Sequence, residues 1–355
     1  MSPKSDSKEI EVKNIVRLCL LLLAGFALPV SWAASPKNDA FYVFGDSLSD
    51  TGNDIILTKA QKIYPAIPPS ESPHRTYYNG RFSNGPVSVE YLWRLLKSDN
   101  NASLTPFLSN KGLKLDGGIN FAFGGSTSGY VNQTPGGFYV PGALGQVELF
   151  RKALKGKKPQ AGALYVIWTG ANDYITGATD QPAEVVANIT KTIETLYSLG
   201  ARNFLVPNLP DLGLAPIIQA EGSERVLEFS QFTETHNALL DRAGDELTIQ
   251  LRGTRIVIVD LYTVSQNLLS TGIPPTSEHV IIAPPALEAI AGGTGAVSCL
   301  FTDPTTCPDV NVTEAVPPFY FWDVLHPTTL IHRIFGQAMF NSLKNQDSQQ
   351  SPNSQ

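Results

Sequence analysis

Short apolar runs alternate with longer segments of helical period along most of the chain. Strands are expected where β-branched and aromatic residues cluster, at residues 40–45, 118–125, 162–170, 202–210 and 254–260. Helices are expected where apolar residues recur every three to four positions, at residues 85–98, 182–200 and within 220–252. This alternation is typical of a parallel sheet covered by helices on both faces. The pattern therefore predicts an α/β fold, built as a three-layer α/β/α sandwich around a parallel sheet.

The alternation breaks between residues 266 and 322. This segment is rich in Pro, Gly, Thr and Ser and has no clean period, and so long a loop inside a compact domain is usually functional or mobile. The polar tail, 346–355, is expected to be disordered. We therefore expect residues 35–345 to form a single domain, with 266–322 as an irregular insertion.

Residues 1–34 have the features of an export signal. Lys13 and Arg17 precede the uncharged run Leu18–Val30, and Ser31 and Ala33 supply small residues for a signal peptidase. The run is short for a membrane span, which needs about 20 apolar residues. An uncleaved anchor is the alternative interpretation. We expect cleavage of the signal peptide and secretion of the mature protein, to the extracellular space or the periplasm.

Composition narrows the class of protein. The 355 residues are 42% hydrophobic and 16% charged, as in a folded globular protein. A formal net charge of −6 makes nucleic acid an unsuitable partner. After loss of Cys19 with the signal, Cys299 and Cys307 remain, and an oxidising compartment favours a disulfide between them. Two cysteines without a histidine cluster do not indicate a metal site.

Candidate chemistry follows the predicted strands, because ligands of open parallel sheets bind beyond the carboxyl ends of the strands. Ser47 follows the first predicted strand, Gly125 ends the second and Asn172 follows the third. A serine nucleophile needs a histidine base held by a further acceptor. Of the five histidines, His326 has Asp323 three residues before it, in "FWDVLHPTT". A lone Asp-x-x-His is common by chance. The interpretation of Asp323 and His326 as catalytic therefore depends on the segments around Ser47, Gly125 and Asn172 as well.

Four segments in order carry a family resemblance: "FGDSLSDTGN", "NFAFGG", "TGANDY" and "DVLHP". Over residues 40–345 the chain resembles the GDSL, or SGNH, hydrolases, and within them secreted bacterial lipases, phospholipases and acyltransferases. The resemblance implies a flavodoxin-like sheet order, Ser47 as nucleophile, His326 as general base and acid, and Asp323 as its support. It also implies an oxyanion hole made by the backbone N–H groups of Ser47 and Gly125 and the side chain of Asn172. No metal or cofactor is expected. The G-x-S-x-G elbow of α/β-hydrolases is absent around Ser47.

The resemblance also suggests substrates. It implies a hydrolase of lipid acyl esters, a phospholipase A or lysophospholipase, with possible acyl transfer to an acceptor alcohol such as a sterol. Transient contact with a membrane or lipid surface is then expected, and the insertion with its cysteine pair is a candidate lid. One alternative is an esterase for short acyl groups, such as acetyl groups on carbohydrates. The other is a catalytically silent binding protein on the same fold.

Two further segments remain open to two interpretations. Residues 75–86, "RTYYNGRFSNGP", are interpreted as a surface loop leading into a helix, whereas the resemblance places them beside the mouth of the active site. Residues 206–216, "VPNLPDLGLAP", face the substrate or form a tight turn.

Overall fold

The computed structural model describes residues 40–109, 117–160, 162–273, 299–310 and 319–350. These described residues all belong to one compact unit. The predicted export signal lies outside the described residues. Within those ranges, every helix is too short or too polar to cross a membrane.

A six-stranded sheet forms the middle of the fold. Its strands in spatial order are β2 (Thr105–Pro106), β3 (Gly117–Asn120), β1 (Ala40–Gly45), β6 (Leu164–Trp168), β7 (Asn203–Pro207) and β8 (Arg255–Val259). Every neighbouring pair is parallel. Apart from the short edge strand β2, this is the flavodoxin-like order, which confirms the predicted fold. The chain reverses its direction across the sheet beside β1, so the ligand site is expected at the carboxyl ends of β1 and its neighbours.

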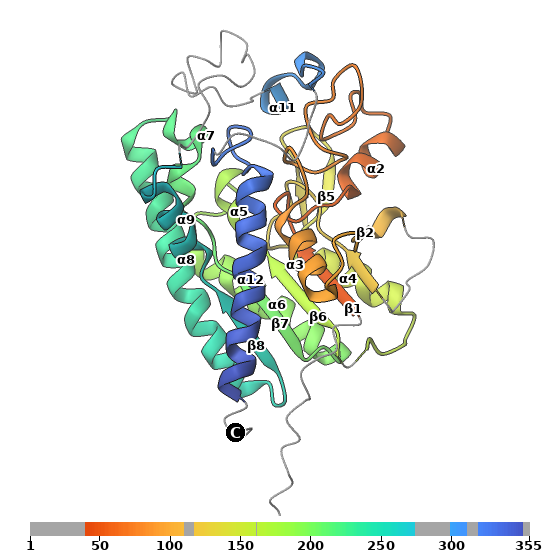
Figure 1. Cartoon of the computed structure of the whole chain (residues 1–355), viewed down its shortest axis with the longest axis vertical. Coiled ribbons are helices and arrows are strands. Elements are labelled where there is room, and N and C mark those ends of the chain that lie inside the picture. The colour runs from red at the N-terminus through yellow and green to blue at the C-terminus, as the bar shows by residue number, and fades with distance from the viewer. Residues whose placement is uncertain (1–39, 110–116, 161, 274–298, 311–318, 351–355) are drawn as a thin grey trace, which may run out of the picture. The chain divides into compact units, whose positions relative to one another are not determined.

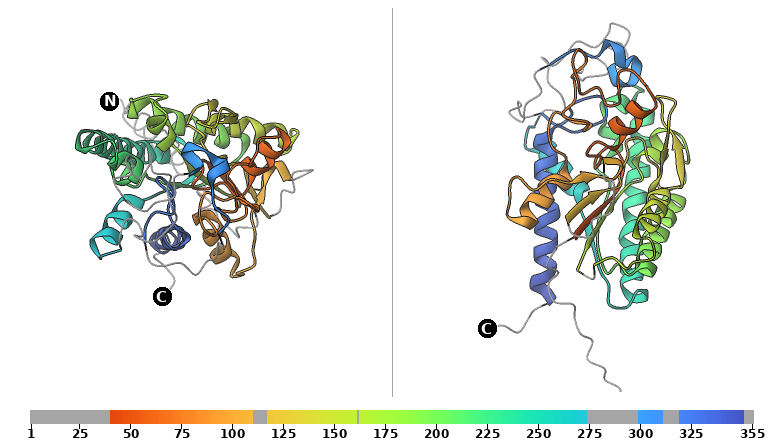
Figure 2. Two further views of the ribbon diagram at one scale, coloured as in Figure 1. Left: turned by 90° about the horizontal axis from the view of Figure 1, so that it is seen from above. Right: turned by 90° about the vertical axis from the view of Figure 1, so that its right-hand side faces the viewer.

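Helices cover both faces of the sheet, as Figures 1 and 2 show. One face carries α3 (Ser88–Lys97), α9 (Leu261–Ser270) and α12 (Thr329–Gln350). The other carries α4 (Ala143–Leu154), α6 (Pro182–Leu199) and α8 (Ser223–Gln250). Shorter elements surround the carboxyl ends of the strands: α2 (Asn53–Ala60), η1 (Phe107–Ser109), β4 (Val131–Gln133), β5 (Tyr139–Pro141), α5 (Ala171–Ile175), η2 (Leu212–Leu214), α7 (Pro216–Gln219), α11 (Cys299–Thr302) and η3 (Pro304–Thr306).

Aromatic side chains of β1 hold the three layers together. Successive side chains of a strand point to opposite faces of the sheet. Phe41 stacks on Trp93 of α3, with ring centres 5.1 Å apart, while Tyr42 and Phe44 contact Phe150 of α4 at 4.9 and 5.7 Å. All five rings are buried. Strand β1 is therefore anchored in both helical layers immediately before the loop that carries Ser47.

Helix α12 corrects the prediction of a disordered tail from residue 346 onward. The helix continues to Gln350, and Arg255 at the start of β8 supplies partners for its last turns. Arg255 forms a 3.0 Å ion pair with Asp347 and donates a 3.2 Å hydrogen bond to Gln346. These polar residues extend the helix because a strand distant in sequence holds them. Residues 351–355 lie outside the described part of the chain.

The insertion is shorter than the predicted range 266–322. Helix α9 runs to Ser270, and the residues from Phe319 to Trp322 are buried in apolar clusters. Between these limits the structure describes residues 271–273 and 299–310. The disulfide joins Cys299 to Cys307, as expected from the composition.

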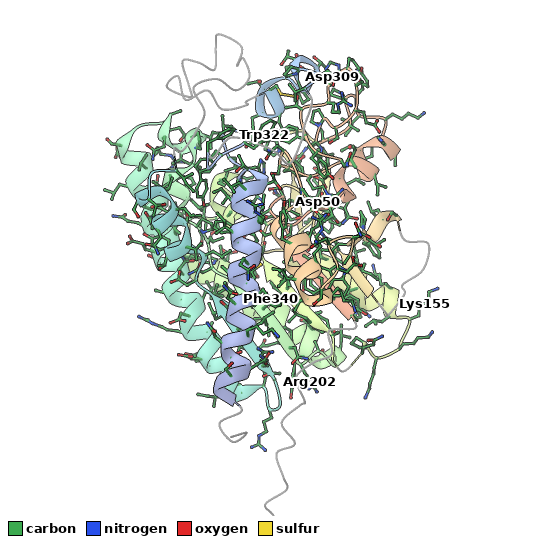
Figure 3. The ribbon with its side chains drawn as sticks, in the orientation of Figure 1. Asp50, Lys155, Arg202, Asp309, Trp322 and Phe340 are labelled. Atoms are coloured by element: carbon green, nitrogen blue, oxygen red, sulfur yellow. A yellow bond between two sulfur atoms is a disulfide. The ribbon has the colours of Figure 1, made fainter. Side chains whose placement is uncertain are left out.

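The segment from Cys299 to Val310, here called the disulfide segment, packs on residues 70–78. Thr76 donates a 2.7 Å hydrogen bond to the Pro308 carbonyl, and Arg75 pairs with Asp309 at 3.1 Å. Figure 3 shows Asp309 near α11, beyond the carboxyl ends of the strands. The disulfide segment therefore lies at the ligand-binding end of the sheet.

Candidate active site

Ser47 lies in a tight turn directly after β1. The Gly45 backbone exchanges two hydrogen bonds with the Gln146 side chain of α4, at 2.8 and 2.7 Å. A Cβ atom at Gly45 would lie 2.3 Å from the carbonyl oxygen of Trp168, so the neighbouring strand leaves room only for glycine. The Asp46 carbonyl accepts hydrogen bonds from two backbone N–H groups of the turn. These contacts hold Ser47, only 6% exposed, at the reversal point of the sheet.

The structure brings together the three residues predicted for catalysis. Ser47 Oγ lies 2.8 Å from His326 Nε2, and His326 Nδ1 lies 2.7 Å from Asp323 Oδ2. His326 and Asp323 occupy the loop before α12, which closes through a 2.7 Å hydrogen bond from Trp322 N–H to the His326 carbonyl. In this geometry imidazole can accept the serine proton while the hydroxyl oxygen attacks a carbonyl carbon. Among the described residues, no cluster of His, Cys, Asp or Glu could hold a metal ion.

Tyr77 is a residue of the site that sequence reasoning missed. Its hydroxyl donates a 2.8 Å hydrogen bond to Asp323 Oδ2, and the backbone N–H of Leu325 donates one of 2.7 Å to Oδ1. Burial, followed by the charge of Asp323, raises the pKa of Tyr77 well above its ordinary value. Tyr77 therefore remains a donor at neutral pH and orients the carboxylate that contacts His326.

Two phenyl rings pack against the imidazole of His326. Phe82 lies 5.2 Å from it between ring centres, and Phe301 of the disulfide segment lies 5.9 Å away with nearly parallel planes. Tyr77 and Phe82 are both buried, so the interpretation of residues 75–86 as a surface loop was wrong. The aromatic residues within that loop were the signal for its place beside the site. The lid role of the disulfide segment stays a prediction.

The three predicted oxyanion donors border one cavity with His326. Gly125 has φ +73°, and a Cβ there would lie 2.8 Å from Thr134 Cγ2. Asn172 follows β6 at the start of α5, and its Nδ2 donates a 3.0 Å hydrogen bond to the Ser126 carbonyl. The amide has a second hydrogen, which remains for a substrate oxygen. The arrangement can therefore stabilise negative charge developing beside Ser47.

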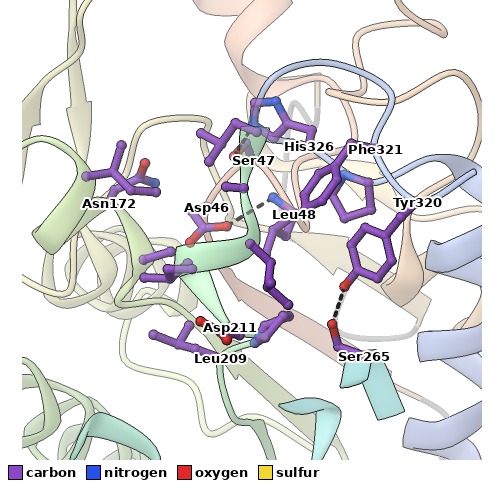
Figure 4. A pocket seen from close by; sticks show the side chains of 18 residues that line it. Asp46, Ser47, Leu48, Asn172, Leu209, Asp211, Ser265, Tyr320, Phe321 and His326 are labelled. Carbon is purple, nitrogen blue, oxygen red and sulfur yellow. Dashed lines mark hydrogen bonds between the residues drawn. The ribbon is translucent and has the colours of Figure 1, made fainter. Parts of the chain in front are cut away.

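Two cavities meet at Ser47, Asn172 and His326. The narrower one, about 50 Å³, is drawn in Figure 4. Residues 209–215 form much of its apolar wall, so this part of the segment predicted to face the substrate does border the site. The wider cavity, about 270 Å³, is bordered by side chains of the loop before α3, the antiparallel hairpin of β4 and β5, and the disulfide segment, among them Phe82, Phe138 and Phe301.

Buried carboxyl groups surround the turn. Burial raises the pKa of Asp46 from 3.8 to about 7, against the opposing effects of the Leu48 N–H and the nearby His326. Burial also raises the pKa of Asp173 to about 6, although Ser128 donates two hydrogen bonds to its carboxylate. Through these two hydrogen bonds Asp173 anchors the loop that follows Gly125. Asp46 helps to hold the turn, because its Oδ1 accepts a 3.0 Å hydrogen bond from the Leu48 N–H.

Asp46→Asn is expected to change how stability depends on pH. The pKa of Asp46 is about 7 in the folded chain and 3.8 in the unfolded chain. Between these two pH values the folded chain holds a proton on Asp46 that the unfolded chain has released. The contribution of Asp46 to wild-type stability therefore falls as pH rises from about 4 to 7. The variant lacks this loss, so its stability relative to wild type should rise by up to about 4 kcal/mol between pH 4 and 8. Urea unfolding across this range measures the difference, and an unchanged difference contradicts the prediction. The exposed substitution Asp180→Asn is the control.

The family of the chain follows from its match to a family model. Residues 41–339 match the model of the GDSL-like Lipase/Acylhydrolase family. The chain belongs to this family. Membership confirms the resemblance in the four sequence segments and identifies the chain as a carboxylic-ester hydrolase.

Individual relatives are distant in sequence. A thermolabile hemolysin of Vibrio parahaemolyticus is 28% identical over 85% of this chain, which spans 63% of the relative's length. A GDSL esterase/lipase of Arabidopsis thaliana is 26% identical over 91% of this chain and 96% of its own. Among solved structures, a lipase/acylhydrolase from Enterococcus faecalis aligns at 14% identity with a TM-score of 0.38, covering 86% of this chain and 96% of its own.

Proposed function

We propose that the protein is a secreted hydrolase of lipid acyl esters, a phospholipase A or lysophospholipase acting through an acyl-enzyme on Ser47. The observation that carries the proposal is the meeting of two largely apolar cavities at the Ser47 hydroxyl. An ester has two substituents, the acyl chain and the alcohol, and each needs space on one side of the attacked carbon. Apolar walls favour a fatty acyl chain, because burying its methylene groups removes apolar surface from water.

The proposed reaction has two halves. Ser47 Oγ bonds to the carbonyl carbon while its proton passes to His326 Nε2, and the carbonyl oxygen becomes an anion facing Gly125 and Asn172. Collapse of this intermediate breaks the bond to the alcohol oxygen, which takes the proton from His326. Water then attacks the acyl-enzyme, loses a proton to His326, and releases the fatty acid and Ser47. An acceptor alcohol such as a sterol in place of water would yield acyl transfer.

Two further observations support a lipid substrate and export. The relative from Vibrio parahaemolyticus is named a hemolysin, and lysis of red cells is an action on a membrane. The features of residues 1–34 support secretion, and an exported enzyme can reach lipids outside the cytoplasm. The small volume of the narrower cavity, about 50 Å³, favours the second candidate, an esterase for short acyl groups.

A substrate series tests the proposal. The chain without residues 1–34 is assayed on phosphatidylcholine, lysophosphatidylcholine and p-nitrophenyl esters from two to sixteen carbons, with and without cholesterol. We expect fatty acid release from both phospholipids, and kcat/KM that rises by about tenfold or more from acetyl to octanoyl esters, because each buried methylene contributes about 0.8 kcal/mol. Activity confined to acetyl esters contradicts the lipid assignment and supports the second candidate. Sterol ester formation would establish acyl transfer.

A further inference from the structure

The antiparallel hairpin of β4 and β5 has one strongly exposed apolar face. In its register Val131 pairs with Pro141 and Gln133 with Tyr139, so these four side chains share a face. Val131 is 63% exposed and Tyr139 is 60% exposed, and the adjoining Tyr130 is 55% exposed. Three of the seven large hydrophobic side chains that are exposed among the described residues therefore lie on this hairpin or directly before it. We call Tyr130, Val131 and Tyr139 the hairpin patch.

The opposite face of the same hairpin belongs to the catalytic cavity. Val140 is buried, and Asn132 Nδ2 donates a 2.8 Å hydrogen bond to the carbonyl of Gly125, a predicted oxyanion donor. Thr134 and Phe138, which follow β4 and precede β5, border the wider cavity. Figure 1 shows β5 at the same end of the sheet as α2 and α11. A surface that contacts the hairpin patch therefore lies next to the cavity that would take its lipid.

The charge distribution supports a particular kind of partner. Residues 117–147 contain no Asp, Glu, Lys or Arg, although 16% of the whole chain is charged. Within the described ranges, the cation placed over a ring of the patch is Lys191 of α6, whose Nζ lies 5.4 Å from the centre of the Tyr130 ring. Uncharged residues avoid the cost of moving a charge toward hydrocarbon, and tyrosine is favoured at membrane–water interfaces.

We infer that the hairpin patch is the surface by which the enzyme docks on an aggregate of zwitterionic phospholipid. The inference rests on the proposed function and names the contact that delivers substrate to that site. Tyr130 and Tyr139 would lie among the headgroups, Val131 would enter the acyl boundary, and Lys191 would pair with a lipid phosphate. A net charge of −6 repels an anionic surface, so a zwitterionic surface is the favoured partner.

The test compares two sets of serine substitutions. The patch variant is Tyr130→Ser with Val131→Ser and Tyr139→Ser. The control variant is Leu227→Ser with Ile249→Ser, which removes hydrophobic side chains that are 60% and 81% exposed on α8. Binding to phosphatidylcholine vesicles is measured by sedimentation. Hydrolysis is measured on the same vesicles and on monomeric p-nitrophenyl butyrate, which needs no interface.

We expect the patch variant to bind vesicles and hydrolyse their lipid at least about tenfold less well, with unchanged rates on the monomeric ester. The control variant should match wild type in all three measurements, and phosphatidylglycerol vesicles should bind wild type more weakly than phosphatidylcholine. Equal vesicle binding by wild type and patch variant overturns the inference. A wild-type dimer that the patch variant dissociates would also overturn it, because a second copy would then cover the patch. A wild type that binds vesicles without cleaving their lipid would refute the proposed function and leave the docking surface intact.

Discussion

Ser47→Ala is expected to lower kcat on ester substrates by about 10⁴ to 10⁶-fold while leaving the fold intact. The hydroxyl 2.8 Å from His326 Nε2 is the nucleophile in the proposed mechanism, and alanine removes the atom that forms the acyl-enzyme. The side chain is small and lies at a cavity wall, so its loss creates little new space. Substrate binding should therefore change far less than the chemical step.

Ser49→Ala is the matched control. It lies two residues away in the same turn and is fully buried, and its hydroxyl has no hydrogen-bond partner among the residues that the structure describes. The control should keep kcat within about threefold of wild type, whereas Ser47→Ala should also lose the initial burst of p-nitrophenol that reports acyl-enzyme formation. Circular dichroism and thermal unfolding verify that both variants fold. Comparable activity of Ser47→Ala and wild type would contradict the assignment of the nucleophile.

Asp323→Asn is expected to lower kcat by about 10⁴-fold, since an amide in this position stabilises the wrong tautomer of the histidine. Asp323 Oδ2 lies 2.7 Å from His326 Nδ1 and 2.8 Å from the Tyr77 hydroxyl, and both atoms donate to it. An asparagine –NH₂ at this position would face two donors and could accept from neither. In the other orientation of the amide, its oxygen would occupy the position of Oδ2. The –NH₂ group would then face the backbone N–H groups of Leu325 and His326, which donate to Oδ1 in the wild type.

Tyr77→Phe provides the graded comparison for the same carboxylate. It removes one donor to Asp323 and keeps the ring that packs beside Phe82, so kcat should fall only about tenfold, about 1.4 kcal/mol. Steady-state kinetics at several pH values on a soluble ester measure both variants, with thermal unfolding as the check on folding. If Asp323→Asn kept more than a tenth of wild-type kcat, the carboxylate would have no part in orienting His326.

Local patterns predicted five of the six strands described in the central sheet and three of the helices that cover it, because these patterns depend on residues close in sequence. The continuous apolar run at 162–170 predicted β6, and the proline start and glycine stop at 182–200 predicted α6. Helix α4 was missed, although it supplies Gln146 to the turn before Ser47. Gly142 and Gly145 at its start weaken the helical signal in the sequence. The sequence alone also does not show that Phe150 of this helix contacts Tyr42 and Phe44 of β1.

The amino-acid sequence by itself determined the α/β class and the family, and through the family resemblance it predicted Ser47, Asp323, His326, Gly125 and Asn172 as the residues of the site. Strand and helix periods depend on residues close in sequence. The four segments that carry the family resemblance can likewise be found in the sequence without the three-dimensional structure. Only the tertiary structure decided which other side chains serve the site. Tyr77 reaches Asp323 across 246 positions, and Arg255 holds Asp347 at the end of α12. Such contacts form when elements distant in sequence pack together in one core. A hydrophobic period within one element does not predict which residue of another element it will contact.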